Sequence, residues 1–379
     1  MATLFLGMVL DTGSETSDDA EEEGQDVPDQ EPSQTNDEID DAASEEENTS
    51  IEDSLRAFGV TSDEEVTGTD DADVFFLEPD PEEVESSYGR IVVSNATVEG
   101  GAGDDIMFLH KTGAVFSYGG GSISGGDGDD SILVSGVDVL IDGGAGNDVI
   151  ETPADGRIWS STILGGEGDD QIDVSFQDGD GFGLIDGGAG NDYIDVRDSS
   201  NGNVIPLGGE GNDTIHVGDD LHWGGTGYTT GGNGGAGDDV LIQDLNIREL
   251  LEPLSSWTNP MVMTGGEGAD TFQLTTVTSS GAYESDSEVR STEAMRVTDF
   301  EVGIDMIVFD LSSATSGVYS VNEAEMSEDA TTGQTTISVL LESDNATDQE
   351  LIITVNATGL TWDDVSFVGA TPTLDPVPV

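Results

Sequence analysis

Glycine and aspartate recur along this chain in one six-residue pattern, glycine-glycine-x-glycine-x-aspartate. The eight copies start at Gly100, Gly125, Gly143, Gly165, Gly187, Gly208, Gly234 and Gly265. They end on Asp105, Asp130, Asp148, Asp170, Asp192, Asp213, Asp239 and Asp270. Carboxylate and carbonyl oxygens form a hard donor set, which suits Ca²⁺ better than Mg²⁺ because Ca²⁺ tolerates roughly six to eight loosely arranged ligands. Transition metals prefer histidine or thiolate, and the eight copies contain neither. The pattern therefore predicts a row of calcium sites.

The glycines at places one, two and four of each copy are suited to building such sites. Glycine permits positive φ angles, and hence a tight curl in which carbonyl oxygens turn outward. If successive copies stack as corners, these oxygens face one another without hydrogen-bond donors, which is costly unless a cation lies between them. The aspartate at place six adds a carboxylate to the same gap.

The residues that flank each corner predict the elements that position it. An apolar residue lies two places after each aspartate: Met107, Ile132, Ile150, Ile172, Ile194, Ile215, Leu241 and Phe272. The corners start 25, 18, 22, 22, 21, 26 and 31 residues apart, and a bulky apolar residue lies two places before six of the eight glycine pairs. One turn therefore contains two short strands joined by two corners, of which only one carries the glycines. We predict an all-β fold, a flattened right-handed parallel β-roll (β-solenoid) with its Ca²⁺ corners on one edge.

This pattern resembles the nonapeptide repeat of the RTX, or haemolysin-type calcium-binding, proteins. The resemblance covers residues 68–272 and begins with a degenerate copy at Gly68–Phe75. It implies that each corner gives alternate carbonyl oxygens to the ion above and the ion below. The residues at places one and three are Gly100, Ala102, Gly125, Asp127, Gly143, Ala145, Gly165, Glu167, Gly187, Ala189, Gly208, Glu210, Gly234, Ala236, Gly265 and Glu267. Eight such corners hold at most about seven ions. Ala269 replaces the usual Asp or Asn at place five, which predicts a weaker last site.

Two C-terminal segments extend the resemblance. Asp299–Asp310 is similar to the segment that follows the repeats in exported RTX proteins, and Gly359–Gly369 is similar to their C-terminal secretion region. The opening MATLFLGMVL lacks a basic start and a small-residue cleavage site, so it is a poor secretory signal. The resemblance therefore implies export by a type I (ABC) secretion machinery that reads the C-terminal signal.

Composition and pattern divide the chain into four parts. Residues 1–66 are predicted to be an acidic disordered tail, because acidic residues are too frequent there for apolar burial to offset conformational entropy. Residues 67–99 hold the degenerate repeat as an N-terminal cap, and residues 100–275 form the roll. Residues 276–379 are predicted to form an antiparallel β cap, with strands within Met295–Asp310, Thr335–Ser343 and Glu350–Asn356.

The overall charge excludes several classes of partner. The chain carries 81 acidic and 8 basic residues, a formal net charge of −73, so no basic patch is available for nucleic acid. It has no cysteine, which excludes disulfides and thiolate metal sites, and no apolar stretch of membrane-spanning length.

The sequence does not favour an enzyme. Its three histidines, His110, His216 and His222, are not part of an H-E-x-x-H motif, and the G-x-S-x-G motif of lipases is missing. No segment outside the roll and its caps is large enough for a catalytic domain.

The expected function is that of a secreted, calcium-stiffened structural or surface-associated protein. Extracellular Ca²⁺ sites bind at roughly 10⁻⁴–10⁻³ M, so the chain would stay unfolded in the cytosol and fold outside the cell. An alternative is a glycan- or surface-binding adhesin, and a third is an RTX-linked hydrolase. The aromatic residues of the variable corners either cover the thin core or form a ligand edge; they are Tyr118, Trp159, Phe182, Trp223, Tyr228 and Trp257. Among these, Trp159, Trp223, Tyr228 and Trp257 are the candidate ligand edge, and the insertion Asn246–Pro260 is a further contact surface.

Overall fold

The computed structural model describes one compact unit within Ser50–Val379; the other unit, Met1–Thr49, lies outside the described residues. The described residues are 56–77, 91–110, 114–118, 121–153, 156, 158–176, 182–197, 203–218, 231–246, 260–277, 289–316, 319–343 and 347–375. They form strands and two short 3-10 turns, η3 (Ala314–Ser316) and η4 (Trp362–Asp364), but no α-helix. None of them forms a helix that is long and apolar enough to span a membrane.

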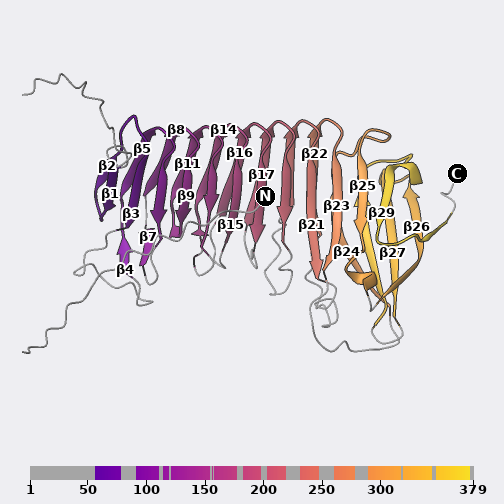
Figure 1. The fold of residues 1–379 in the computed structure, drawn as a ribbon. Coiled ribbons are helices and arrows are strands. Elements are labelled where there is room, and N and C mark those ends of the chain that lie inside the picture. Colours follow the sequence, from indigo (N-terminus) through magenta and orange to yellow (C-terminus); the bar gives the residue numbers. More distant parts are fainter. Residues whose placement is uncertain are drawn as a thin grey trace, which may run out of the picture. The chain divides into compact units, whose positions relative to one another are not determined.

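Two long sheets run along this unit, with the hydrophobic core between them (Figure 1). The 12-stranded sheet has the order β1 (Arg56–Val60), β3 (Asp73–Leu77), β6 (Ile106–Leu109), β9 (Ser131–Val134), β12 (Val149–Glu151), β15 (Gln171–Ser175), β17 (Tyr193–Arg197), β19 (Thr214–Val217), β21 (Val240–Asn246), β23 (Thr271–Val277), β25 (Met306–Asp310) and β29 (Val365–Val368). The 14-stranded sheet has the order β2 (Glu65–Thr67), β5 (Thr97–Ala102), β8 (Ser122–Asp127), β11 (Leu140–Ala145), β14 (Thr162–Glu167), β16 (Phe182–Ala189), β18 (Asn203–Glu210), β20 (Gly231–Ala236), β22 (Met261–Glu267), β24 (Arg290–Val297), β28 (Gln349–Val355), β27 (Gln334–Glu342), β26 (Ser320–Asp329) and β30 (Thr373–Leu374). A small third sheet has the order β13 (Ile158–Trp159), β10 (Gly136–Val137), β7 (Ala114–Tyr118) and β4 (Ile91–Val93).

From β1 to β25 the strands of the two long sheets alternate along the chain, and each pairs in parallel with the strand one turn away. Equivalent residues of successive turns are in register; Ile150 pairs with Ile172, and Ile172 with Ile194. This arrangement confirms an all-β fold with long parallel sheets, consistent with a solenoid.

Aliphatic side chains from both sheets fill the narrow core between them. Ile132, Ile150 and Ile172 on one sheet, and Ile141 and Ile163 on the other, are each at most 1% exposed. β-branched side chains stack well on identical neighbours across parallel strands. Because the core keeps successive turns in register, each glycine corner lies directly beside the equivalent corner of the next turn.

The ordered sheets extend beyond the limits that the sequence predicted. The predicted disordered tail reaches residue 66, but β1 and β2 begin at Arg56 and Glu65. The prediction of antiparallel strands within Met295–Asp310 is wrong, because β24 and β25 each pair in parallel with both neighbours. Only β26, β27 and β28 pair antiparallel. Alternating apolar residues indicate one buried face of a strand and carry no information on strand direction.

Candidate metal centre

The three glycines of each corner serve two different structural needs. At places two and four every glycine has a φ between +103° and +141°, a region that other residues rarely adopt. The glycine at place one has no such φ, so the prediction of positive φ at this place is wrong. It is required for space: a Cβ on Gly165 would lie 2.3 Å from the carbonyl oxygen of Gly187 and 2.4 Å from Oδ2 of Asp170.

The aspartates at place six form a continuous buried ladder. In each corner Oδ1 accepts a hydrogen bond from the backbone N–H of the preceding corner's aspartate, at 2.7–3.0 Å. These eight aspartates are only 1–2% exposed. The structure thus brings together all the aspartates that the sequence singled out.

The second carboxylate oxygen of most of these aspartates has no hydrogen-bond partner. Seven buried Oδ2 atoms are in this state, those of Asp105, Asp130, Asp148, Asp170, Asp192, Asp213 and Asp239. In each of their corners, a Cβ at place one would lie 2.2–2.4 Å from this Oδ2 and 2.2–2.6 Å from the place-one carbonyl oxygen of the next corner. Each gap between two successive corners is therefore bordered by an anionic oxygen and a carbonyl oxygen.

The charge of the ladder increases the cost of leaving these oxygens without a partner. Burial raises the pKa of Asp130 and Asp170, and with the lowering effect of one N–H donor and the raising effect of neighbouring aspartates the pKa is about 7. Burial likewise raises the pKa of Asp148, Asp192, Asp213, Asp239 and Asp270 to about 6, and that of Asp105 above its ordinary value. A buried, partnerless carboxylate is stabilised by a cation. The donor set, oxygen only and anionic, fits a hard divalent ion such as Ca²⁺.

The carbonyl oxygens at place three, which the RTX resemblance implies as ligands, already have one partner each in seven corners. Each accepts the place-four N–H of the preceding corner at 2.7 Å, as Glu167 does from Gly146 and Ala189 from Gly168. Because a carbonyl oxygen has two lone pairs, one remains for an ion.

The ladder is longer at both ends than the eight repeats. Asp73 donates its N–H to Asp105, and Asp270 donates its N–H to Asp305, so ten aspartates are stacked in all. Sequence analysis identified Asp73 in the degenerate copy but missed Asp305. A signal was present, because Ile307 lies two places after Asp305, as an apolar residue does in every copy.

A second, exposed ladder runs along place five in the opposite direction. Here the later residue donates its N–H to the side chain of the earlier one, as from Asn147 to Asp129 and from Asp169 to Asn147. The ladder ends at Ala269, whose N–H donates to Asp238 but whose side chain cannot continue it. The effect of Ala269 on the last ion site stays a prediction.

The side chains at place three alternate strictly between alanine and an acid along the eight corners, a pattern that the sequence analysis missed. The order is Ala102, Asp127, Ala145, Glu167, Ala189, Glu210, Ala236 and Glu267. All four acids are exposed, and each is in register with an alanine of the adjacent turn. Carboxylates therefore do not stack on neighbouring strands at this place.

Most of the predicted aromatic ligand edge falls outside the described residues. This applies to Trp223, Tyr228 and Trp257, whereas Trp159 on β13 is half-buried. The indole Nε1 of Trp159 is buried without a hydrogen-bond partner. The aromatic ligand edge therefore stays a prediction.

The two described histidines lie on strands or at their ends; His222 is outside the described residues. His216 on β19 lies between two carboxylates of neighbouring turns, with Nε2 at 3.1 Å from Asp244 and Nδ1 at 3.6 Å from Asp195. Nδ1 of His110 is 2.8 Å from the hydroxyl of Ser135.

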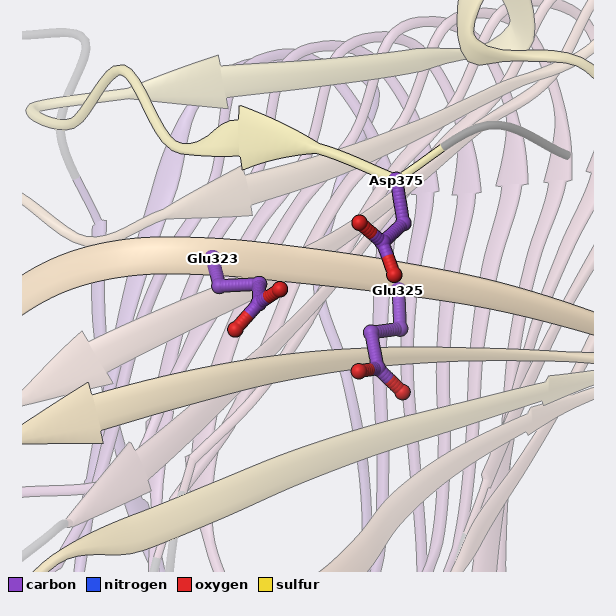
Figure 2. A group of neighbouring side chains, drawn as sticks. All are labelled: Glu323, Glu325 and Asp375. Carbon is purple, nitrogen blue, oxygen red and sulfur yellow. The ribbon is translucent and has the colours of Figure 1, made fainter.

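A group of three acids lies far along the chain from the corners. Oxygens of Glu323, Glu325 and Asp375 lie within 4.8 Å of one another, and Figure 2 shows them at β26 and just after β30. All three residues are exposed. This group lacks the buried, partnerless oxygens that distinguish the corner gaps.

No protein-family model matches the chain, and no curated protein matches it.

Proposed function

We propose that this protein is a secreted calcium-binding β-roll of the RTX type, which folds when Ca²⁺ binds outside the cell and then acts as a structural or surface-associated protein. One observation carries the proposal: seven buried Oδ2 atoms have no partner, and each borders a gap with a carbonyl oxygen on its other side. Burying an unpaired charge is too costly to recur seven times in a fold unless a cation compensates it.

In this proposal the roll is right-handed, its glycine corners are the Ca²⁺ sites, and residues 276–379 close its C-terminal end. Within each gap the aspartate Oδ2 binds from one corner, and the place-one carbonyl binds from the next. The aspartate Oδ1 keeps its hydrogen bond to the preceding corner and so holds the carboxylate in position. A bound Ca²⁺ neutralises the carboxylates and links the two corners. Its binding free energy is therefore part of the folding free energy.

In this proposal, Ca²⁺ binding at the corners couples folding to secretion. At extracellular-class affinities of roughly 10⁻⁴–10⁻³ M, the corners stay empty in a cytosol that is poor in free Ca²⁺. Repulsion among the stacked carboxylates then keeps the chain unfolded, in a form that a type I exporter can thread. Outside the cell the same carboxylates bind ions, and the sheets form. The resemblance of Gly359–Gly369 to RTX secretion regions supports this route.

Calcium titration of the metal-free full-length chain tests this proposal. Circular dichroism should show strand formation as Ca²⁺ rises through the millimolar range, and calorimetry should show several ions bound. Mg²⁺ at the same concentration should have little effect, because it demands near-octahedral geometry. A chain with the same strand content and melting temperature with and without Ca²⁺ would refute the proposal.

The adhesin alternative concerns the same secreted protein and a different surface. Trp159, the described residue of the predicted ligand edge, is half-buried, and its indole Nε1 is buried without a hydrogen-bond partner. Replacing Trp223 and Trp257 together and measuring glycan or cell-surface retention separates the two functions. Unchanged retention favours the purely structural role, and lost retention with intact Ca²⁺-dependent folding favours the adhesin.

A further inference from the structure

The ten stacked aspartates leave nine gaps along the ladder, and these gaps are not alike. Seven share two features, a partnerless buried Oδ2 on one side and a place-one carbonyl oxygen on the other. The gap between Asp73 and Asp105 lacks the partnerless Oδ2. The gap between Asp270 and Asp305 lacks both features, because Oδ2 of Asp270 is not among the buried partnerless atoms and no carbonyl oxygen is among the three nearest neighbours of a Cβ on Gly265. The inference that follows rests on the proposed function and concerns which gaps bind an ion.

At the N-terminal end, a threonine supplies the hydrogen bonds that the interior aspartates lack. Oδ2 of Asp73 accepts the backbone N–H of Thr69 at 2.7 Å and its hydroxyl at 2.9 Å. The carbonyl side of this gap is normal, because a Cβ on Gly68 would lie 2.0 Å from the carbonyl oxygen of Gly100. Thr69 occupies place two, which is glycine in all eight regular corners. Its two donor hydrogens point at the oxygen that would otherwise bind a cation.

At the C-terminal end, the carbonyl side is missing and backbone N–H groups bind the carboxylates. A Cβ on Gly265 would meet only atoms of Asp270 as its three nearest neighbours, all within 3.0 Å, with no carbonyl oxygen of a following corner among them. Oδ2 of Asp305 accepts the N–H of Glu301 at 2.7 Å. The two oxygens of Asp299 accept the N–H groups of Gly265 and Gly266, each at 3.0 Å.

We infer that the ladder holds ions only in its seven interior gaps, and that Thr69 at one end and Asp299 with the Glu301 amide at the other close the outer gaps without metal. At both ends of the ladder the protein's own donors bind carboxylate oxygens of the terminal corners. Oδ1 of Asp73 is itself buried without a partner, but its Oδ2 is satisfied by Thr69, so in this inference residues outside the eight regular repeats set the ion count.

Ion counting on the full-length chain tests this inference. Equilibrium dialysis in physiological salt, with free Ca²⁺ well above roughly 10⁻³ M and the bound ions counted by elemental analysis, should give seven ions for the natural chain. Asp170→Asn, in the interior, should lose one ion, whereas Asp73→Asn and Asp305→Asn should keep all seven. Asp375→Asn is the matched control, because it removes a charge from the exposed acidic group and should also leave the count unchanged. Loss of an ion from either end variant, with the control unaffected, overturns the inference.

A gain-of-site variant gives the converse test. The N-terminal corner reads GTDDAD at Gly68–Asp73, so Thr69→Gly with Asp71→Gly restores the regular pattern. This double variant should bind eight ions, one more than the natural chain; an unchanged count overturns the role of Thr69.

Anomalous diffraction from calcium-loaded crystals of the natural chain tests the inference without any variant, so a variant that fails to fold does not affect it. Peaks are expected in the seven interior gaps, and a peak beside Asp73 or Asp305 contradicts the inference. A natural chain that binds no ions at all refutes the proposed function instead, so the two failures are distinguishable.

Discussion

Without divalent ions the roll should be unstable at neutral pH and should regain stability as the pH is lowered. Burial raises the pKa of Asp130 and Asp170 to about 7, and that of five other ladder aspartates to about 6, from 3.8. A carboxyl group with a raised pKa in the folded state destabilises that state once it is ionised. In the metal-free protein, the stabilisation that these protonated carboxyl groups give to the folded state is therefore complete below pH 3.8. It is lost as the pH rises through their folded-state pKa values of about 6 to 7.

The size of the effect follows from the pKa values. A rise of about 2 to 3 in pKa corresponds to roughly 3–4 kcal/mol per carboxyl group as an upper limit, since one pKa unit is about 1.4 kcal/mol. Lowering the pH from 7.5 to 5.0 should increase the free energy of unfolding by roughly 1–2 kcal/mol per group. The full amount is not reached, because pH 5.0 is still above the unfolded-state pKa of 3.8. Several groups together approach the whole stability of a domain, about 5–15 kcal/mol. The metal-free chain should thus be unfolded at pH 7.5 and at least partly folded at pH 5.0.

Circular dichroism and thermal melting of resin-treated, metal-free protein at the two pH values measure this directly. A resin is preferable to EGTA, which loses affinity for Ca²⁺ in acid. The calcium-loaded protein is the control, and it should melt at a lower temperature at pH 5.0, because protons compete with Ca²⁺ for the carboxylates. Equal strand content of the metal-free chain at both pH values would show that the ladder carboxylates do not control folding.

Three substitutions test separate parts of the corner. Gly165→Ala places a Cβ against two oxygens and should cost about 1–3 kcal/mol and weaken Ca²⁺ binding in calorimetry. Gly232→Ala, whose Cβ would approach only side-chain atoms and none closer than 3.3 Å, should cost less. Asp170→Asn should raise the Ca²⁺ concentration needed for half-folding in a dichroism titration, but Asp169→Asn should not, because asparagine also occurs at place five; equal effects would contradict the site assignment. Asp299→Ala leaves two N–H groups without partners and should cost about 1–3 kcal/mol in urea unfolding of the calcium-loaded protein; no loss would exclude its role as an end closure.

The repeat pattern predicted the all-β fold, its long parallel sheets and the alignment of the eight aspartates. This worked because each turn repeats the same apolar and glycine positions, so one local solution applies along the whole roll. Identical inward residues, such as Ile150 and Ile172, then set the register.

The sequence analysis failed where the local pattern does not determine the partner. It did not foresee that β24 and β25 continue the parallel sheets, because an alternating strand can pair in either direction. It also missed the closure of the outer gaps, since Thr69 and Asp299 act through hydrogen bonds that depend on three-dimensional stacking. The sequence analysis gave the wrong reason for glycine at place one, because crowding by neighbouring oxygens is not visible in a sequence.

The alternation of alanine and acid at place three gives the roll a natural module of two turns. Strands of a sheet lie about 4.8 Å apart, so the exposed carboxylates at this place recur every ~9.6 Å, slightly more than the ~8 Å Debye length of physiological salt. Deleting a single turn would bring two acids, such as Asp127 and Glu167, onto adjacent strands, whereas deleting a pair would preserve the alternation. Longer or shorter versions of this scaffold, natural or engineered, should therefore differ from it by even numbers of turns.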